Sequence, residues 1–445
     1  MRELEARTPE HMPEPDLDRM RALMEFLDHP EALFPAIQVT GTNGKTTATR
    51  IAAAVACAHG LSTGVFVSPH VLSVTERLSL CADPIGEQEF ADEYERLGPY
   101  FDLVDVRVGR VTYFEALTAL AFAWFADKPA GLGVLEVGMG GRWDATNVAR
   151  GEVAVVCPVG LDHVGILGDT VEEIAAEKAG IIKPGGTAVL REQRPEALAV
   201  LRARAEEVGA PILLEGKDFG VEWRTPAVGG QAITVRGVHA TYLDLALPLF
   251  GDAAARGAAA AIVACETLLD RSLDSSAVRA ALASVVVPGR MEVVGRRPLV
   301  VLDGAHNPDA AAAVVAALRE SFSWRRLLVV AAMFGDKDVE AVAGTIGSLA
   351  DAAFAAAPAS PRAAPVARVA DALAAAGVED VGRFASVAEA VDAAGAAAEE
   401  EDLILVTGSF YTVAEARPRF VGPADARTRR RADPASDSTE EGPTT

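Results

Sequence analysis

The sequence IQVTGTNGKTT at residues 37–47 combines residue types that bind the phosphates of a nucleotide. Gly41 and Gly44 let backbone N–H groups close around an anion, and the N-terminus of a following helix adds a partial positive charge. Lys45 can reach the outer phosphates, and the hydroxyl of Thr46 can bind Mg²⁺. The loop is shorter than the G-x-x-x-x-G-K-[ST] pattern, because its first glycine lies only three residues before the second. It predicts a phosphate-binding loop, with a glycine-rich turn that binds nothing as the alternative.

Further polar residues follow apolar runs that are typical of buried strands. In an open α/β sheet, ligands bind beyond the carboxyl ends of the strands, which places such residues at the edge that holds the phosphate loop. Glu136 opens the glycine-rich EVGMGGRWDATN and is expected to bind Mg²⁺, unless it only caps a flexible turn. A lone histidine is more often structural than a ligand, but the place of His163 after a strand favours a ligand. The candidates in chain order are Ser68, His70, Glu136, Asp162 and His163.

Lysine is rare in this chain, since only six of its 41 lysine and arginine residues are lysine. Arginine cannot act as a neutral amine, so the few lysines are worth examining for a chemical role. Lys128 and Lys217 lie in polar turns and are expected to face solvent, whereas the other four lie in motifs. Lys178 lies in the last turn of a helix expected in TVEEIAAEKAG, where Thr170 and Glu173 form a capping box. The alternative is a lysine that only complements the helix dipole. The six are Lys45, Lys128, Lys178, Lys183, Lys217 and Lys337.

Alternating strands and helices must position these residues. The apolar patterns predict strands at residues 37–39, 64–67, 132–137 and 153–157, and helices at 18–27, 46–60, 112–125 and 170–180. Alternation over 221–249 predicts antiparallel strands, and a second unit is expected to have strands at 299–302, 327–331, 353–356 and 403–406. The expected fold class is α/β, with an N-terminal P-loop ATPase-like domain of mostly parallel sheet plus a small antiparallel sheet, and a C-terminal Rossmann-like α/β domain. The expected divisions are a flexible N-terminus at 1–16, the two domains at 17–287 and 288–425, and a disordered tail at 426–445.

The composition excludes several classes of function. The chain has 445 residues and a net charge of −22, which argues against nucleic acid or an anionic membrane surface as a partner. No apolar run approaches the roughly 20 residues of a membrane span, and MRELEARTPE lacks the layout of a signal peptide, so a cytoplasmic location is expected. The cysteines show no C-x-x-C spacing, which favours buried free thiols over a metal site or disulfides. They are Cys57, Cys81, Cys157 and Cys265.

Nine motifs resemble, in order and spacing, those of the folylpolyglutamate synthase/dihydrofolate synthase family of the Mur-ligase superfamily. They are GTNGKTT, SPH, TYFEALT, EVGMGGRWDATN, LDH, EKAGIIKP, PGRME, DGAHNP and TGSFYTVAEA, spread over residues 18–416. The resemblance implies an ATP-dependent ligase that moves the γ-phosphoryl group onto a carboxylate, so that the amino group of L-glutamate can attack the acyl phosphate. It implies ATP and Mg²⁺ as cofactors, with a monovalent cation such as K⁺ as an optional third. The expected partners are small molecules, namely ATP, L-glutamate and a folate or pteroate, and a monomer is expected.

The resemblance also implies roles for individual residues. In the family, the lysine matching Lys178 is carbamylated by CO₂ and helps to bind a second cation. The catalytic residues implied are Lys45, His163, Lys178, Asp303 and His306. ATP is expected at Gly41, Thr42, Asn43, Gly44, Lys45, Thr46, Thr47, Arg290, Asp303 and His306, and metal ions at Thr46, Ser68, Glu136, His163 and Lys178. The resemblance places the acceptor at Arg142, Asp144, Ala145, Thr146 and Asn147. Lys337 and Ser409 follow further strands at the same edge, and from that position we expect them to hold the incoming glutamate.

The sequence departs from the family at one place. Members usually have His-Gln and then an asparagine that contributes to adenine binding, where this chain has Ala253, Ala254 and Gly257. Either the base is held otherwise, or its affinity is weaker, or the function has drifted. The expected activity is addition of L-glutamate to a folate-type carboxylate, acting on tetrahydrofolate, on dihydropteroate or on both. A ligase for another carboxylate and a nucleotide-binding regulator without ligase activity remain as alternatives.

Overall fold

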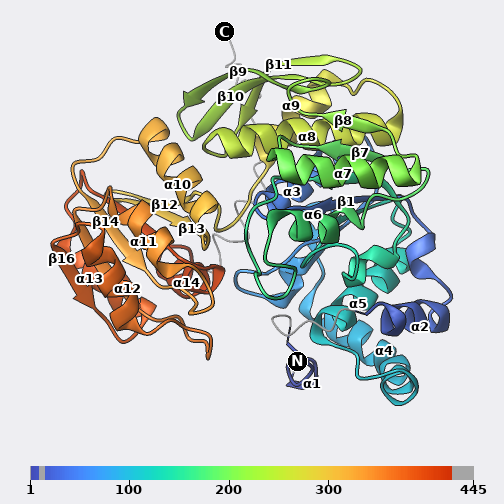
Figure 1. Ribbon diagram of the computed structural model, residues 1–445, viewed down its shortest axis with the longest axis horizontal. Coiled ribbons are helices and arrows are strands. Elements are labelled where there is room, and N and C mark those ends of the chain that lie inside the picture. Colours follow the sequence, from blue (N-terminus) through green and yellow to red (C-terminus); the bar gives the residue numbers. More distant parts are fainter. Residues whose placement is uncertain (1, 10–15, 423–445) are drawn as a thin grey trace, which may run out of the picture.

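The computed structural model describes residues 2–9 and 16–422. They form two α/β units that lie side by side, the smaller of which is orange to red in Figure 1. The larger unit contains an eight-stranded sheet and a three-stranded antiparallel sheet, and the smaller unit contains a six-stranded sheet. The expected α/β fold class is confirmed.

The eight-stranded sheet has the order β4-β3-β2-β5-β1-β6-β7-β8. Its central strand β1 (Ala36–Thr40) pairs in parallel with β5 (Leu132–Glu136) and with β6 (Gly151–Val156). All residues of β1 and β5 are buried, as expected for a parallel sheet with both faces covered. The other strands are β2 (Thr63–Phe66), β3 (Leu78–Leu80), β4 (Asp83–Pro84), β7 (Thr187–Leu190) and β8 (Ile212–Leu214). Because β1, β2, β5 and β6 run in parallel, their carboxyl ends meet at one edge.

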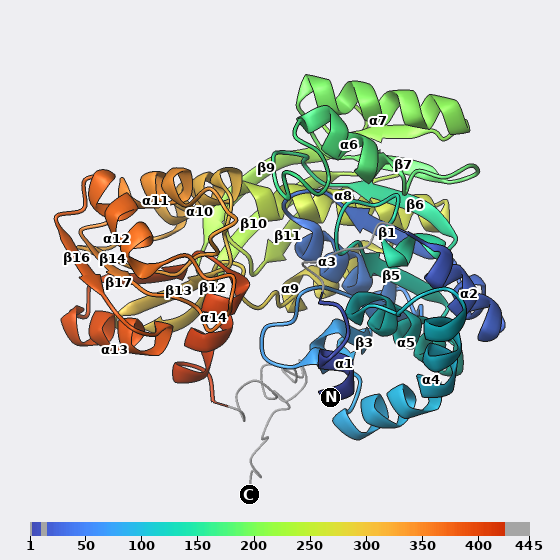
Figure 2. The same ribbon diagram turned by 60° about the horizontal axis from the view of Figure 1, so that its bottom comes forward.

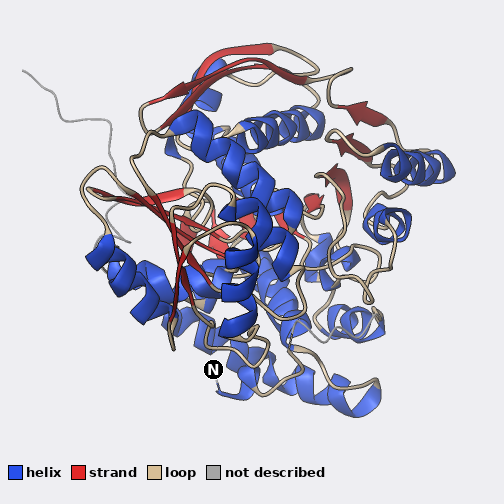
Figure 3. Ribbon diagram, turned by 60° about the vertical axis from the view of Figure 1, so that its left-hand side comes forward, coloured by secondary structure: helices blue, strands red, loops and turns tan. Residues whose placement is uncertain are grey.

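Helices cover this sheet in three groups, each with its own core. The first comprises α3 (Lys45–Ala58), α8 (Asp252–Leu269) and α9 (Ser275–Ser284). It shares its core with the antiparallel strands β9 (Gly220–Ala227), β10 (Gly230–Arg236) and β11 (Thr241–Leu247), which lie at the top of Figure 3. The second comprises α2 (Asp18–Phe26), α4 (Glu87–Arg107) and α5 (Tyr113–Asp127), and the third α6 (Val171–Ala179) and α7 (Pro195–Val208). Short 3₁₀ helices are η1 (Pro30–Ala32), η2 (Val74–Arg77) and η3 (Ala145–Val148).

The second unit has the strand order β12-β13-β17-β14-β15-β16, parallel except for the edge strand β12. The strands are β12 (Glu292–Arg296), β13 (Leu299–Asp303), β14 (Leu327–Ala331), β15 (Ala352–Ala355), β16 (Asp380–Arg383) and β17 (Leu403–Thr407). Its helices are α10 (Pro308–Ser321), α11 (Val339–Gly347), α12 (Val366–Ala375), α13 (Val387–Ala397) and α14 (Phe410–Ala416), followed by η4 (Arg417–Arg419). The first three share one core and α13 and α14 share another, so both faces of the sheet are covered.

The N-terminus differs from the expectation of a flexible segment at 1–16. A short helix, α1 (Arg2–Glu5), packs beside α5, and Leu4 is fully buried (Figure 2). Arg7 is also buried, where it donates to the backbone oxygen of Val111 at 2.9 Å and to the hydroxyl of Tyr94 at 3.2 Å. The buried side chains of Leu4 and Arg7 therefore hold this segment against the first unit, although its composition is typical of a loose segment. Residues 1 and 10–15, like the expected tail at 426–445, lie outside the described residues.

The prediction of four free cysteines is wrong for two of them. Cys57 and Cys81 form a disulfide, whereas Cys157 and Cys265 are free and buried. Cys57 lies in α3 and Cys81 in the turn between β3 and β4, where the pairing of β2 with β3 brings the two together. Sequence spacing does not show this proximity. Among the described residues, no helix is long and apolar enough to cross a membrane.

Candidate active site

The phosphate loop joins β1 to α3, as predicted. Gly44 has a φ of 89°, a left-handed conformation that favours glycine, and lies directly before the first residue of α3. A Cβ on Gly41 would lie 2.5 Å from the Cβ of Cys157, so only glycine fits at position 41. Lys45 Nζ donates to the backbone oxygens of Gly41 at 3.0 Å and Thr42 at 3.2 Å. The ammonium group and the first N–H groups of α3 together form an anion-binding site.

Glu136 ends β5 and is buried beside this loop. Its Oε1 accepts a hydrogen bond from Thr46 Oγ1 at 2.8 Å, and its Oε2 accepts one from the backbone N–H of Ser68 at 3.1 Å. Burial raises the pKa of Glu136, although the charge of Lys45 and the two hydrogen bonds act in the opposite direction. A cation beside the carboxylate would favour its charged form, so this buried oxygen cluster fits Mg²⁺. Three of the five expected metal-binding residues therefore lie together.

His163 lines the same cavity as Ser68 and Glu136. Its backbone has a φ of 53°, which is uncommon outside glycine. Burial lowers the pKa of His163 to about 3, although the adjacent Asp162 acts to raise it. The imidazole is therefore neutral and able to bind a metal ion. Within the described part of the chain, no three histidine, cysteine, aspartate or glutamate side chains group closely enough to hold a metal alone, so hydroxyls and phosphate oxygens would have to complete the site.

Lys178 lies on α6 behind the phosphate loop. It is 3% exposed, and its Nζ donates to the backbone oxygen of Gly41 at 3.0 Å. Burial, assisted by the charge of Lys45, lowers the pKa of Lys178 to about 7. A substantial fraction is then neutral near physiological pH, which is the state that can add CO₂. The capping box at Thr170 and Glu173 is formed as predicted, but Lys178 contacts the back of the loop and is not among the residues that line the cavity.

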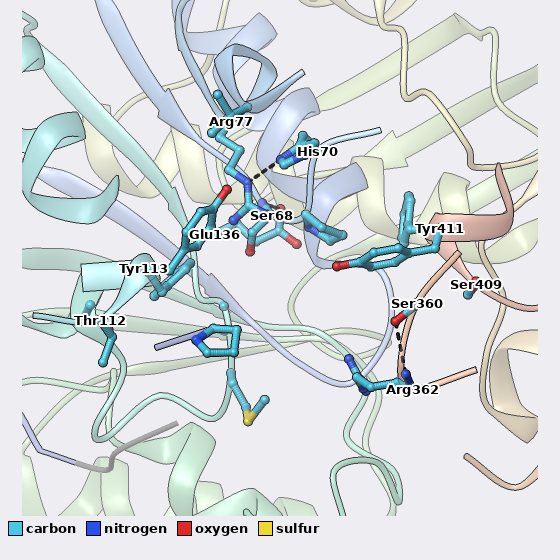
Figure 4. Close-up of a pocket in the computed structure, with 18 of the residues that line it drawn as sticks. Ser68, His70, Arg77, Thr112, Tyr113, Glu136, Ser360, Arg362, Ser409 and Tyr411 are labelled. Carbon is cyan, nitrogen blue, oxygen red and sulfur yellow. Dashed lines mark hydrogen bonds between the residues drawn. The ribbon is translucent and has the colours of Figure 1, made fainter. Parts of the chain in front are cut away.

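A cavity of about 1610 Å³ lies between the two units, and both contribute to its wall. The first unit supplies Thr42, Lys45, Ser68, Glu136 and His163, and the second supplies Arg290, His306, Lys337 and Ser409. In Figure 4, Ser68, His70 and Glu136 face Ser360, Arg362 and Tyr411 across the cavity. The loops at the carboxyl ends of the two sheets thus enclose one chamber.

Arg290 and His306 bring a guanidinium and an imidazole from the second unit into this chamber. The guanidinium of Arg290 lies 4.3 Å from the centre of the Phe410 ring, and burial lowers the pKa of Arg290. Asp303 accepts a hydrogen bond from the backbone N–H of Met291 at 2.8 Å. Asp303 is not among the cavity-lining residues, so its contact in this structure fixes the turn that presents Arg290.

The loop after β5 was expected to bind the acceptor. Asp144 is buried there and accepts hydrogen bonds from the backbone N–H groups of Met139 and Thr146, both at 3.0 Å. The amide of Asn147 donates to the backbone oxygen of Gly180 at 3.2 Å, which ties the loop to the end of α6. Of the expected residues, Asp144 and Ala145 line the cavity, whereas Arg142, Thr146 and Asn147 are not among its lining residues.

Several cavity residues were missed as site residues because their partners come from other segments. Arg77 Nε donates to His70 Nδ1 at 2.9 Å, and the Arg77 guanidinium lies 5.5 Å from the centre of the Tyr113 ring. Burial, assisted by the charge of Arg77, lowers the pKa of His70 to about 4. The imidazole is neutral with its proton on Nε2, because Nδ1 accepts from Arg77. Only the SPH motif drew attention to this place. Trp143 also lines the cavity and lies within EVGMGGRWDATN, although it was not named as a site residue; nothing in the sequence indicated Arg362, which lines the cavity as well.

Charged side chains surround the start of α8, where the family has its adenine-binding asparagine. Arg191 donates to the backbone oxygen of Ala253 at 3.4 Å, and Arg256 Nε donates to Glu215 Oε1 at 2.6 Å. A Cβ on Gly257 would lie 3.9 Å from the side chain of Thr47, so this helix packs against the phosphate-loop helix. The departure in sequence therefore lies beside the nucleotide-binding loop.

Comparison with known proteins defines the class of protein first. The Mur ligase middle domain matches residues 39–265, and the glutamate ligase domain of Mur ligases matches residues 289–410. The structure superposes with a TM-score of 0.90 on the Mycobacterium tuberculosis folylpolyglutamate synthase complexed with ADP, at 36% identity and over 94% of this chain and 97% of that one. It also superposes with a TM-score of 0.84 on E. coli FolC in complex with DHPP and ADP, at 32% identity and over 95% and 96% of the two chains. The chain is a ligase of the Mur type.

The particular family follows from the curated relatives. The chain is 40% identical over 361 residues to the dihydrofolate synthase/folylpolyglutamate synthase of Mycobacterium tuberculosis, covering 77% of this chain and 74% of the relative. It is 35% identical over 379 residues to the enzyme of that name from Escherichia coli, covering 84% of each. The chain belongs to the folylpolyglutamate synthase/dihydrofolate synthase family of ATP-dependent ligases.

Proposed function

We propose that the enzyme joins L-glutamate to the carboxylate of a folate-type acceptor, through an acyl phosphate made with ATP. The observation that supports this most directly is the shared chamber, in which the phosphate loop and Glu136 lie on one side and Lys337, Arg362 and Ser409 on the other. A nucleotide hydrolase needs only the first of these walls. A ligase needs both, because a carboxylate, a phosphoryl group and an amine must meet in one place.

The first step places the acceptor carboxylate in line with the γ-phosphate of ATP. Lys45 and the amides at the start of α3 bind the phosphates, and Arg290 and His306 approach from the second unit. Thr46 and Glu136 would hold Mg²⁺, with Ser68 and His163 as candidates for a second cation. Such ions, when bound, neutralise the charge of the phosphate oxygens. Catalysis then depends on position and charge, which preorganised groups supply.

The second step brings the amino group of glutamate to the acyl phosphate. Lys337, Arg362 and Ser409 belong to the part of the chamber wall that the second unit supplies, and they carry groups that bind carboxylates. The amine attacks the acyl carbon, the amide bond forms, and the bond to phosphate breaks with release of phosphate. Water must be excluded during this step, because it would hydrolyse the acyl phosphate. Closure of the two units around the chamber provides that exclusion.

Lys178 is proposed to be carbamylated. The neutral amine attacks CO₂, forms an N–C bond and loses a proton, which converts a cationic group into a carboxylate-like one. The oxygens gained would suit a hard cation beside the phosphate loop, and K⁺ is proposed there as an alternative to a second Mg²⁺. The amine faces Gly41 O in this structure, so the modified group would have to turn towards the cavity to reach a metal.

The remaining proposals concern scope. The enzyme is proposed to be a monomer in the cytoplasm. The net charge of −22 supports the further proposal that it binds neither nucleic acid nor an anionic membrane surface. The domain division at 17–287 and 288–425 is proposed because β12 (Glu292–Arg296) is the first strand of the six-stranded sheet; residues 423–425 lie outside the described residues. The proposed acceptors are tetrahydrofolate, dihydropteroate or both.

The test is release of phosphate from ATP with each acceptor, in the presence and absence of L-glutamate. We expect release that depends on both substrates, together with a product heavier by one glutamyl residue. Release without glutamate, and no amide product, would instead indicate a nucleotide-hydrolysing regulator. Release that requires glutamate and a different carboxylate would indicate a ligase with another acceptor.

A further inference from the structure

Asp162 is a carboxylate of the first unit that contacts three side chains of the second unit, in addition to the neighbouring His163 of its own unit. Its Oδ1 lies 2.5 Å from Lys337 Nζ, and its Oδ2 lies 3.3 Å from His306 Nε2. The amide of Asn307 donates to the same Oδ2 at 3.4 Å. The side chains of Asp162 and Lys337 are 7% and 9% exposed, so these contacts are largely out of reach of solvent. One aspartate therefore contacts three side chains from two different loops of the second unit.

The phosphate loop reaches the same cluster. Asn43 and Asn307 exchange two hydrogen bonds between their side-chain amides, at 3.1 Å and 3.0 Å. Asn307 also caps α10, because its Oδ1 accepts from the backbone N–H of Ala310 at 2.9 Å. The phosphate loop, Asp162 and the first turn of α10 are thus joined by one network across the boundary between the units.

The charges in the chamber explain why a carboxylate is needed at this place. Lys45, Arg290 and Lys337 all line the chamber, and a cation removed from water is stabilised by an adjacent anion. Asp162 supplies that anion to Lys337. An incoming carboxylate or phosphoryl group could then bind Lys337 without moving it far, since the ammonium group can contact more than one oxygen.

We propose that Asp162 is a positioning residue, which latches the second unit onto the phosphate loop and holds Lys337 ready for the incoming glutamate. The latch consists of contacts within this chain alone. The latch between the units is independent of the reaction, whereas the role of Lys337 towards glutamate rests on the proposed function.

The experiment compares Asp162→Asn with Asp309→Asn, which removes the charge of another ion pair between the units. Asp309 lies 3.3 Å from Arg194, but their side chains are 53% and 49% exposed, and exposed pairs contribute little. Small-angle scattering of the nucleotide-free proteins should give a larger radius of gyration for Asp162→Asn, and no change for Asp309→Asn. Equal radii for Asp162→Asn and the unaltered enzyme would overturn the latch, whatever the enzyme's substrate is.

Steady-state kinetics distinguish a positioning role of Asp162 from a general loss of structure. We expect Asp162→Asn to raise KM for L-glutamate by about tenfold or more, with a smaller change in KM for ATP, and Asp162→Glu to recover part of the loss. Lys337→Gln approaches the same contact from the other side and serves if the aspartate variant fails to fold. The double variant should have a KM for L-glutamate close to that of Lys337→Gln alone. If the increases in KM from the two single substitutions instead multiply in the double variant, the role of Asp162 towards Lys337 is refuted.

Discussion

Replacing Lys178 by methionine should change how stability depends on pH, because the pKa of this buried amine is lowered to about 7. Between that value and the ordinary lysine pKa, the unfolded chain binds one proton more than the folded one, so stability rises with pH. For a folded pKa of about 7, the wild type should gain about 2 kcal/mol from this residue between about pH 7.5 and about pH 9. Lys178→Met lacks this gain, so the difference in unfolding free energy between the two proteins should shift by that amount in favour of the wild type.

Urea unfolding at several pH values, in buffer freed of CO₂, measures this difference and cancels the titrations that both proteins share. Lys128→Met is the matched control. Lys128 is exposed, and its hydrogen bond with Glu89 raises its pKa, so it stays protonated throughout this window. A flat difference curve for Lys178→Met would mean that the amine keeps an ordinary pKa, and the reasoning from burial would then be refuted.

A neutral amine also has a chemical consequence. With a pKa of about 7, about three quarters of Lys178 is neutral at about pH 7.5, against about a thousandth of an ordinary lysine. Isotope-labelled bicarbonate should therefore give a carbamate signal in the wild type that is absent from Lys178→Arg, which should be inactive. Lys178→Ala should lose activity that acetate partly restores at high concentration. Full activity of Lys178→Arg would show instead that Lys178 only complements the dipole of its helix.

Three further predictions concern other parts of the chain. Lys45→Ala should abolish most turnover while circular dichroism shows an intact fold, because Lys45 is the lysine of the phosphate loop; normal turnover would exclude that role. With Ala253 and Gly257 in place of the family's polar residues, kcat/KM for ATP and GTP should differ little, since a lost pair of base hydrogen bonds removes about 1 to 3 kcal/mol of discrimination; strict preference for ATP would show that other groups read the base. Cys57→Ser should lower the unfolding free energy by about 3 kcal/mol, as expected for a cross-link between residues 24 apart, and a change below about 1 kcal/mol would contradict that chain-entropy estimate.

The parts of the fold that the sequence predicted are those in which local pattern and burial agree. The strand before the phosphate loop and those at Leu132–Glu136 and Leu327–Ala331 are apolar runs buried throughout, so composition alone locates them. The edge strands β8, β12 and β16 were missed. None of their residues is buried, and the only uninterrupted apolar sequence among them is the three-residue β8, which is too short to stand out. The helix α4 was missed as well. Its Pro99 favours a break, yet burial of Phe101 and Val104 keeps the helix continuous.

The site residues also fall into those that a local sequence pattern predicted and those that it could not. Residues at strand ends, such as Glu136 and His163, were predicted because topology delivers strand ends to one edge. The pair of His70 and Arg77 depends on a return of the chain through η2, and the approach of Lys337 to Asp162 depends on how two separate sheets meet. Such contacts have no local signal in the sequence. The proposed chemistry of Lys178 came from family resemblance, and burial adds the physical reason for it.

The scarcity of lysine has a practical consequence for chemical labelling. Lys128 and Lys217 have side chains that are 44% and 77% exposed, and neither lines the cavity. The other four lysines lie in the cavity or donate hydrogen bonds to backbone oxygens beside it, as Lys183 does to Asn147 at 2.9 Å. Amine-reactive dyes and surfaces should therefore couple to lysine side chains mainly at two points outside the reaction chamber. The enzyme could be immobilised or made fluorescent through its own lysines, with the chamber left open to substrates.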